Sequence, residues 1–402
     1  MDESIFTVGM GISVKLDAGQ SVHLPDETMQ YLFNHIQTVL NSYQGNPPLS
    51  AYLKNYFRSH TKLGSRDRKV ITTAVYSYYR AKRFTPSSDW QAITKAVLLS
   101  QPQQSPLLLK LLDQIQPAAL SASPLEPLPS FSGHLDPITW FASMQTQPYL
   151  FIRVRRDTTT MARLLQEAGV VFDKISEDCW RLPNGCPVDK LLPADKYVVQ
   201  DWASQQSIRQ VAAACGEMPA RVWDVCSGAG GKSIFLKDHW RSFSLLATDI
   251  RERILQNLKI RFQLYQIDNF KTLVLDTAHQ DQVRQKLGRQ TFDLVLCDVP
   301  CSGSGTWART PEQFHFFKQE NLQHFQALQY PIVANARQYL KPGGLLAYIT
   351  CSVFEAENEA VTARLQATYP ELQLIHQGII DGIALGADCM YMALLSHNTA
   401  AS

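Results

Sequence analysis

The chain has 402 residues, of which 45% are hydrophobic and 18% charged, and 38 Lys and Arg residues against 36 Asp and Glu residues leave a formal net charge of +2. This length predicts two or three domains, and the composition is that of a globular protein rather than a disordered one. No stretch reaches the 18 or so consecutive apolar residues of a membrane span, and Asp2 and Glu3 do not fit a signal peptide, so we expect a cytoplasmic protein.

The eight cysteines form no CxxC pair and show no repeated spacing. This pattern fits reduced thiols in a cytosolic protein better than a disulfide framework. It also argues against a zinc site.

Helical periodicity dominates residues 26–112. Apolar residues recur at steps of three and four from Met29 to Tyr43, until Gly45 and two prolines end the pattern. The apolar runs that continue it are Val70–Tyr78, a run beginning near Trp90, and Leu107–Leu109. We therefore predict a helical domain over residues 1–115.

A basic and aromatic segment lies inside this helical region. Residues 54–83 hold nine basic residues and one acidic residue among many tyrosines and phenylalanines. Basic groups can bind phosphates and aromatic rings can stack on bases, so the segment predicts an RNA-binding surface. A solvated basic face over an aromatic core explains the composition equally well. The basic residues are Lys54, Arg58, Lys62, Arg66, Arg68, Lys69, Arg80, Lys82 and Arg83.

Four prolines among Ser and Ala predict a linker over residues 116–132. Residues 133–200 then change to the order strand, helix and strand, which is typical of a small α+β module. The segments are Tyr149–Val154, Met161–Ala168 and Val170–Phe172. We expect this module to bind RNA, and Arg153, Arg155 and Arg156 could reach a nucleic-acid backbone, although surface arginines on an edge strand are the commoner explanation.

Strands and helices alternate over residues 201–402. This alternation predicts an α/β fold, a doubly wound and mostly parallel sheet with helices on both faces. Such sheets bind ligands beyond the carboxyl ends of their strands. The predicted strands are Arg221–Val225, Ser244–Ala247, Thr272–Leu275, Phe292–Cys297 and Gly344–Ile349, with helices beginning at Lys232 and Arg251.

A glycine-rich turn joins the first of these strands to a helix. Its glycines let the backbone approach a ligand closely, and the free amides of the helix start favour an electronegative group. Neither the GxxxxGK[ST] nor the GxGxxG spacing occurs in this turn, which excludes two familiar nucleotide-binding motifs. The residues that we expect to bind a ligand here are Cys226, Ser227, Gly228, Ala229, Gly230, Gly231 and Lys232.

Acidic residues follow the next three predicted strands, at Asp249, Asp276 and Asp298. In folds of this kind an acidic residue at the end of the second strand accepts hydrogen bonds from ribose hydroxyls. A single aspartate would be interpreted as a helix cap. The series, however, predicts a crevice for a nucleoside.

Two cysteines also follow predicted buried strands directly. Cys301 lies in the sequence DVPCSGSG at 298–305, and Cys351 lies in TCS at 350–352. Their common position at the ligand-binding edge suggests thiol chemistry on one substrate. Without that context, either cysteine would be interpreted as a small buried hydrophobic residue.

The motifs DVCSGAGGKS, TDI, DVPCSGSGTWARTPE and LKPGGLLAYITCSVFEAENEAV together resemble the RNA cytosine-5 methyltransferases of the Sun/RsmB type, which use S-adenosylmethionine and have a Rossmann-like catalytic domain. The resemblance runs from about residue 150 onward and includes Val199-Gln200-Asp201. The first 115 residues, with LGSRDR at 63–68, are less closely similar to the NusB-type RNA-binding domain of bacterial ribosomal RNA members. Ser227-Gly228-Ala229 replaces the usual Ala-Ala-Pro, which puts the affinity for the cofactor in question.

The resemblance implies a role for each of four residues. Cys351 would add to carbon 6 of the cytosine, because carbon 5 alone is a poor nucleophile. Asp298 would hold the base, and Lys232 is a candidate source of the positive potential that favours a thiolate. Cys301 would assist removal of the carbon 5 proton and release of the product.

Residues next to these four carry further expectations. Two glycines would let the backbone pass close to an extruded base. One arginine could hold a neighbouring phosphate, and three glutamates fit an acidic helix start. These residues are Gly303 and Gly305, Arg309, and Glu355, Glu357 and Glu359.

We predict an S-adenosylmethionine-dependent RNA cytosine-5 methyltransferase, monomeric and acting on ribosomal RNA because of the amino-terminal helical domain. A tRNA methyltransferase with the same chemistry and a catalytically silent RNA-binding assembly factor remain alternatives. The intact Cys301 and Cys351 argue against the silent factor, whereas the altered turn at 227–229 argues for it. A DNA cytosine methyltransferase is least favoured, because those enzymes take the nucleophile from a Pro-Cys element and lack the TCS partner.

Overall fold

The computed structural model describes residues 26–101 and 105–398. The predictions that concern the first 25 residues, including Asp2 and Glu3, therefore lie outside the described residues. Among the helices of these two ranges, none is both long and apolar enough to cross a membrane.

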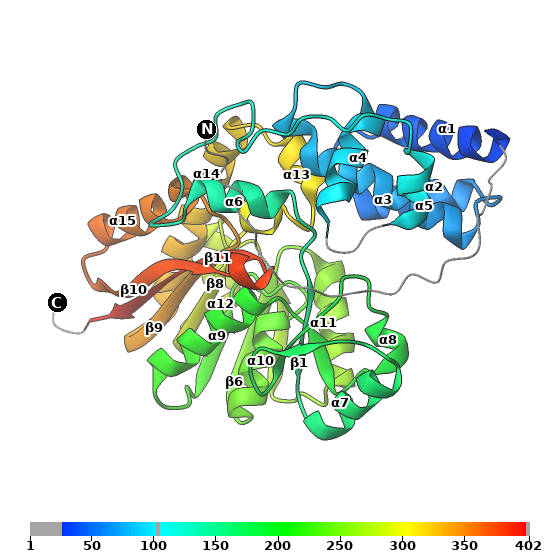
Figure 1. Cartoon of the computed structure of the whole chain (residues 1–402). Coiled ribbons are helices and arrows are strands. Elements are labelled where there is room, and N and C mark those ends of the chain that lie inside the picture. Colours follow the sequence, from blue (N-terminus) through cyan, green and yellow to red (C-terminus); the bar gives the residue numbers. More distant parts are fainter. Residues whose placement is uncertain (1–25, 102–104, 399–402) are drawn as a thin grey trace, which may run out of the picture.

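The amino-terminal helices form a bundle around one apolar core, drawn in blue to cyan in Figure 1. Four helices match the predicted runs. The remaining helix, Leu49–Ser59, was not predicted, because Pro48 ends the preceding apolar pattern. Pro48 is the N-cap of this helix, where its missing N–H costs nothing. The helices are α1 (Asp26–Ser42), α2 (Leu49–Ser59), α3 (Ser65–Ala81), α4 (Trp90–Ser100) and α5 (Pro106–Leu111).

The segment predicted as a linker forms hydrogen bonds with the helical bundle and with the carboxyl-terminal domain. The amide of Ala118 donates to the carbonyl oxygen of Ala92 in α4 at 3.0 Å, and that of Ser132 donates to Val353 at 2.8 Å. The linker thus runs along the bundle and ends beside the carboxyl-terminal domain. The elements that follow it are α6 (Pro137–Met144), β1 (Leu150–Val154), α7 (Thr158–Glu167), β2 (Asp173–Lys174), β3 (Cys179–Leu182), α8 (Val188–Leu191) and β4 (Tyr197–Val199).

The small module is an antiparallel sheet with the strand order β2-β3-β1-β4. The prediction of a strand at 170–172 is wrong. Gly169, at a φ of 67°, ends α7 and turns the chain, so the side chain of Val171 is 79% exposed and pairing begins only at β2.

Arg153 of β1 and Arg155, just after this strand, point inward rather than toward a nucleic acid. β1 lies between β3 and β4, and both Arg153 and Arg155 form ion pairs of 2.6 Å with Asp238 of the following domain. The prediction that they reach an RNA backbone is therefore wrong for these two residues. Arg156 is exposed.

The carboxyl-terminal domain has a seven-stranded sheet with the order β10-β11-β9-β8-β5-β6-β7, in which β5 to β9 are parallel. The fold-class prediction is confirmed, except that the antiparallel hairpin β10–β11 at one edge was not foreseen. The elements are α9 (Trp202–Cys215), β5 (Arg221–Asp224), α10 (Gly231–Trp240), β6 (Ser244–Asp249), α11 (Glu252–Leu264), β7 (Phe270–Val274), α12 (Gln280–Leu287), β8 (Phe292–Asp298), α13 (Pro311–Phe316), α14 (Glu320–Ala336), β9 (Leu340–Thr350), α15 (Glu359–Thr368), β10 (Leu372–Asp381) and β11 (Cys389–His397).

Two apolar layers lie against this sheet. α9, α10 and α11 bury their apolar sides on one face, and α12, α14 and α15 bury theirs on the other. The strand order reverses between β5 and β8, because β6 and β7 continue to one side and β9 to the other. Crevices at such reversal points are the usual ligand sites of open α/β sheets.

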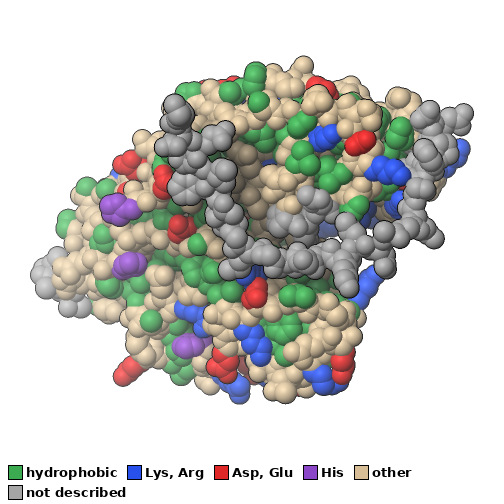
Figure 2. Space-filling model, viewed as in Figure 1, with side chains coloured by type: hydrophobic (Ala, Val, Ile, Leu, Met, Phe, Trp, Pro, Cys, Tyr) green, Lys and Arg blue, Asp and Glu red, His purple; other side chains and the backbone are tan. Residues whose placement is uncertain are grey.

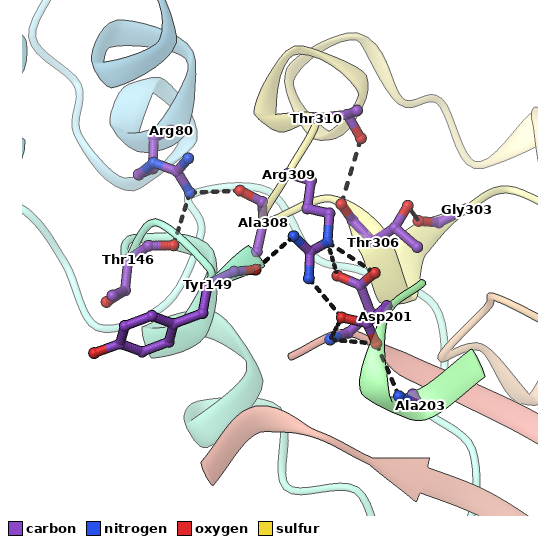
Figure 3. A network of polar contacts seen from close by, with 11 residues as sticks. Arg80, Thr146, Tyr149, Asp201, Ala203, Gly303, Thr306, Ala308, Arg309 and Thr310 are labelled. Carbon is purple, nitrogen blue, oxygen red and sulfur yellow. Dashed lines mark hydrogen bonds and ion pairs between the residues drawn. The ribbon is translucent and has the colours of Figure 1, made fainter. Parts of the chain in front are cut away.

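Arg80 connects the helical bundle to the rest of the chain. Its buried guanidinium donates three hydrogen bonds, of 3.0, 2.9 and 2.8 Å, to the carbonyl oxygens of Met144, Thr146 and Ala308. Figure 3 shows the bonds to Thr146 and Ala308. α3 also packs on α13, beside which it lies in Figure 1. Part of the predicted RNA-binding segment is thus structural.

Arg309 forms a second junction, also shown in Figure 3. It donates to Asp388 at 2.7 Å, to the carbonyl oxygen of Tyr149 at 2.8 Å, and to Asp201, which caps α9. The prediction that Arg309 holds a phosphate is therefore wrong, because its donors are bonded within the protein.

Candidate active site

The two predicted cysteines meet at the carboxyl edge of the sheet. Cys301 follows β8 and Cys351 follows β9, and these parallel neighbours bring the two Sγ atoms to 3.1 Å from each other. Both cysteines are free and partly exposed. The amide of Cys351 also donates to the Sγ of Cys301 at 3.3 Å.

The contact between the two sulfurs affects the ionisation of Cys301. The hydrogen bond with Cys351 and burial raise the pKa of Cys301 well above its ordinary value, and the Gly303 amide opposes them only in part. Cys301 is therefore a neutral thiol near pH 7. Either sulfur can be the donor of the hydrogen bond between the two cysteines.

A single buried carboxylate holds both cysteine turns. Glu357 lies in the short 3-10 helix Glu355–Glu357 and is 0% exposed. It accepts hydrogen bonds from the amide and hydroxyl of Ser302, at 2.8 and 2.5 Å, and from the hydroxyl of Ser352 at 2.5 Å. Gln329 donates a further bond at 3.0 Å. Glu357 lies with Glu355 in the first turn of a short helix, in line with the predicted acidic helix start. It also connects the residues that follow Cys301 and Cys351.

Gly305 packs within the protein rather than against a base. Its amide donates to the carbonyl oxygen of Cys351 at 2.9 Å, and an added Cβ would lie 2.0 Å from the carbonyl oxygen of Cys389. The absence of a side chain therefore lets the loop after Cys301 approach β11. Gly303 differs, because its φ of 74° is a conformation that favours glycine.

Lys232 and Asp298 face each other across the reversal point of the sheet. Lys232 is at the start of α10 and Asp298 is the last residue of β8, and the Nζ to Oδ2 distance is 2.5 Å. The lysine was predicted to supply positive potential to a cysteine. The structure instead brings its ammonium to the carboxylate that was predicted to hold the base.

Asp249 lies beside the glycine-rich turn, as predicted. Its buried Oδ2 accepts a hydrogen bond from the amide of Gly228 at 3.0 Å. Burial raises the pKa of Asp249, but hydrogen bonds and the charge of Arg251 outweigh it, so the pKa is lowered and the group is a carboxylate. Arg251 binds both carboxylate oxygens, at 2.9 and 3.0 Å, yet its side chain is 63% exposed and free to move away.

The glycine turn leaves space on its outer side. A Cβ added at Gly228 or Gly231 would meet no atom within 4 Å, whereas one at Gly230 would lie 2.8 Å from the ring of Phe262. Gly228 also has a φ of 52°. The departure from the family's Ala-Ala-Pro thus places a glycine where the backbone conformation favours one.

Asp224 at the end of β5 is a residue that sequence reasoning missed. It is 1% exposed, and its Oδ2 accepts from Ser233 at 2.5 Å while Oδ1 has no partner within the described chain. Burial raises its pKa to about 7. Its position at the end of a predicted strand could have indicated it, as the same position did for the other aspartates.

The other residues that were predicted to bind a ligand also lie at this edge of the sheet. Asp276 caps the turn after β7 by accepting from the amide of Ala278 at 3.0 Å. Ser227 bonds through its hydroxyl to the carbonyl oxygen of Thr248 at 3.0 Å, and Ala229 accepts from Arg261 at 2.6 Å. Burial raises the pKa of Cys226 well above its ordinary value.

Comparison with known proteins supports the resemblance for part of the chain. Residues 216–400 match the family model described as 16S rRNA methyltransferase RsmB/F. The chain is 32% identical over 228 residues to the ribosomal RNA small subunit methyltransferase B of Xanthomonas campestris, covering 54% of this chain and 51% of that protein. The Salmonella arizonae protein of the same name is 32% identical over 247 residues, covering 58% and 55%. The chain thus spans about half the length of the curated relatives it matches.

Solved structures share the fold at lower identity. The crystal structure of PH0851 superposes with a TM-score of 0.68 at 19% identity and covers 94% of this chain and 100% of that one. A methyltransferase homologue from Pyrococcus horikoshii gives a TM-score of 0.53 at 19% identity, covering 64% and 90%. These likenesses establish the fold.

We expect Gly305→Ala to destabilise the protein, because the new methyl group would overlap the carbonyl oxygen of Cys389. Overpacking of this kind lowers the free energy of unfolding by about 1–3 kcal/mol, which urea denaturation would measure. Gly378→Ala is the control, because a Cβ there meets no atom within 4 Å. Equal shifts of the two urea midpoints would contradict the close packing of Gly305.

Proposed function

We propose that this protein transfers a methyl group from S-adenosylmethionine to carbon 5 of a cytosine in RNA, with ribosomal RNA as its substrate class. The observation that carries the proposal is the pair of sulfurs 3.1 Å apart beside Asp298 at the carboxyl edge of the sheet. One thiol can add to the base while the second remains beside the reacting atoms. A methyl transfer to carbon 5 needs these two functions.

The ionisation of the pair supports an order of events. Cys351 adds to carbon 6, and the electron density that builds at carbon 5 makes that atom nucleophilic. Once Cys351 is a thioether, its sulfur can no longer ionise or donate a hydrogen bond to Cys301. Two of the causes that raise the pKa of Cys301, its hydrogen bond and its Coulomb interaction with Cys351, then disappear. The pKa of Cys301 therefore falls after the first step, which favours its action on the carbon 5 proton at that stage.

Asp298 is suited to hold the ring of the cytosine. It is 30% exposed at the side chain, and Lys232 fixes one of its oxygens. The other oxygen can accept from the exocyclic amine of the base. In this interpretation Lys232 positions Asp298 and does not activate a cysteine.

The residues of the glycine turn fit S-adenosylmethionine, which when bound supplies the methyl sulfonium. Asp249 offers a buried carboxylate to ribose hydroxyls, and Gly228 and Gly231 leave the outer side of the turn open. The partnerless Oδ1 of Asp224 is a further acceptor nearby. The turn thus has the acceptors and the space that a nucleoside needs.

The helical bundle offers a surface for RNA. A groove of about 500 Å³ between α2 and α3 has the rings of Phe57 and Tyr76 in its walls, with Lys54, Arg58 and Arg68 around it. Figure 2 shows Lys and Arg side chains among hydrophobic ones on the upper part of the molecule, where Figure 1 places the bundle. Rings that stack on bases and cations that bind phosphates fit single-stranded RNA.

We also propose that the protein acts as a monomer in the cytoplasm. Both cysteines, Asp298 and the glycine turn come from one chain, so the site needs no residue of a second copy. Ribosomal RNA as the substrate supports the location.

Asp249→Asn should weaken binding of S-adenosylmethionine roughly tenfold or more, because a charge-assisted hydrogen bond is worth about 1.5–3 kcal/mol. Calorimetry on the variant and the wild type would measure this. Asp293→Asn is the matched control, since Asp293 accepts hydrogen bonds from Arg221 and Lys341 at the opposite end of β8. No binding by the wild-type protein would favour a silent assembly factor.

The two cysteine variants should fail at different steps. With unmodified small-subunit ribosomal RNA, Cys351→Ala should form neither product nor covalent complex, and Cys301→Ala should form a complex that it cannot resolve. The complex would migrate slowly on a denaturing gel and disappear after RNase treatment. An adduct from the Cys351 variant alone would reverse the assigned roles, and methylation by both variants would sink the thiol mechanism. tRNA transcripts in parallel test the substrate class.

Lys54→Gln with Arg58→Gln should weaken RNA binding and lower the slope of log affinity against log salt by roughly 1.4–1.8, because two phosphate contacts release fewer counterions. Filter binding at several salt concentrations would measure the slope. The control is Arg284→Gln with Arg289→Gln, two exposed arginines at α12. An unchanged slope in the first variant would mean that the basic face is only solvated.

A further inference from the structure

The contact between Cys301 and Cys351 has a second chemical consequence. Their Sγ atoms are 3.1 Å apart, and a disulfide needs about 2.05 Å, so closure by roughly 1 Å would join them. Glu357 bonds to Ser302 and Ser352, the residues that follow the two cysteines. These bonds hold the two cysteine-bearing turns together.

We propose that Cys301 and Cys351 form a reversible disulfide when the protein meets a peroxide, and that this modification switches the active site off. The disulfide itself follows from the geometry of the two turns. Only the loss of activity rests on the proposed function, because a sulfur bound in a disulfide cannot add to carbon 6.

The reaction balances with hydrogen peroxide as the oxidant. The pKa of Cys301 is raised well above its ordinary value, so in this proposal the sulfur of Cys351 attacks first; the O–O bond breaks, a sulfenic acid forms and one water leaves. The sulfur of Cys301 then attacks the sulfenic sulfur. The S–S bond forms as the S–O bond breaks, and the thiol proton leaves with the hydroxide as a second water. Two thiols and one peroxide give one disulfide and two waters, and a dithiol reverses the change.

The other cysteines are less suited to this reaction. Burial raises the pKa of Cys226 and of Cys297, which keeps these two neighbouring thiols protonated. Burial likewise raises the pKa of Cys186 and of Cys215. A protonated thiol reacts poorly with peroxide, because the thiolate is the nucleophile.

The test is a count of free thiols in the full-length protein. Wild-type protein would be treated with hydrogen peroxide, quenched with catalase, denatured and alkylated with iodoacetamide. Intact mass should show loss of two of the eight reactive thiols, and peptide mapping should find one cross-linked peptide containing Cys301 and Cys351. Dithiothreitol should restore all eight.

Variants separate this pair from the remaining cysteines. Cys215→Ser should still form the cross-link, whereas Cys301→Ser should form none and should instead accumulate oxygen on Cys351. Eight thiols alkylated after peroxide, a cross-link between Cys226 and Cys297, or oxygen addition alone in the wild type would each overturn the proposal.

An activity assay on the same samples keeps the two proposals distinguishable. Methylation should be lost in proportion to the cross-link and should return with dithiothreitol. A cross-link in a protein that methylates no RNA would leave the disulfide standing and remove the proposed function. Methylation that is lost while all eight thiols remain free would remove the proposed disulfide and leave the proposed function standing.

Discussion

The active site depends on one buried carboxylate. Glu357 is 0% exposed and accepts bonds from both serines that follow the cysteines. A buried charge is costly unless hydrogen bonds satisfy it, so the turns must stay closed around it. The pairing of β8 with β9 brings the two sulfurs together, and the bonds to Glu357 connect the residues that follow the two cysteines. This arrangement serves both the proposed methyl transfer and the proposed disulfide, since each needs the two thiols close together.

Arg80 and Arg309 connect the domains of the molecule. Arg80 bonds to the carbonyl oxygen of Ala308, and the next residue, Arg309, bonds to Asp201 and Asp388. The helical bundle, the small module and the large sheet thus meet on the loop that follows Cys301. An RNA held by the bundle would lie in a fixed relation to the cysteines, which favours a folded substrate that contacts both parts. The basic residues of the bundle divide accordingly: Arg80 builds the junction, while others such as Lys54 remain exposed.

The sheet explains why so many functional groups gather in one place. The parallel strands β5 to β9 end at one edge, and the reversal of strand order between β5 and β8 opens that edge. Lys232 and Asp298 close the crevice from opposite sides at 2.5 Å. The charges predicted to act separately on cysteine and base therefore form a pair. The raised pKa of Cys301 comes from its contact with Cys351 and from burial.

The sequence by itself determined the parallel sheet, most of the helices and the location of the site. The periodicity of apolar residues and the residues at strand ends are local properties of the sequence. Parallel strands necessarily present Asp249, Asp298 and the two cysteines at the same edge of the sheet. Only the tertiary structure decided which partner each polar side chain takes. Ser302 and Glu357 are 55 residues apart, and Arg309 and Asp201 are 108 apart. No periodicity predicts such pairs, because they form only when the domains pack and bury groups that must then find a hydrogen-bonding partner.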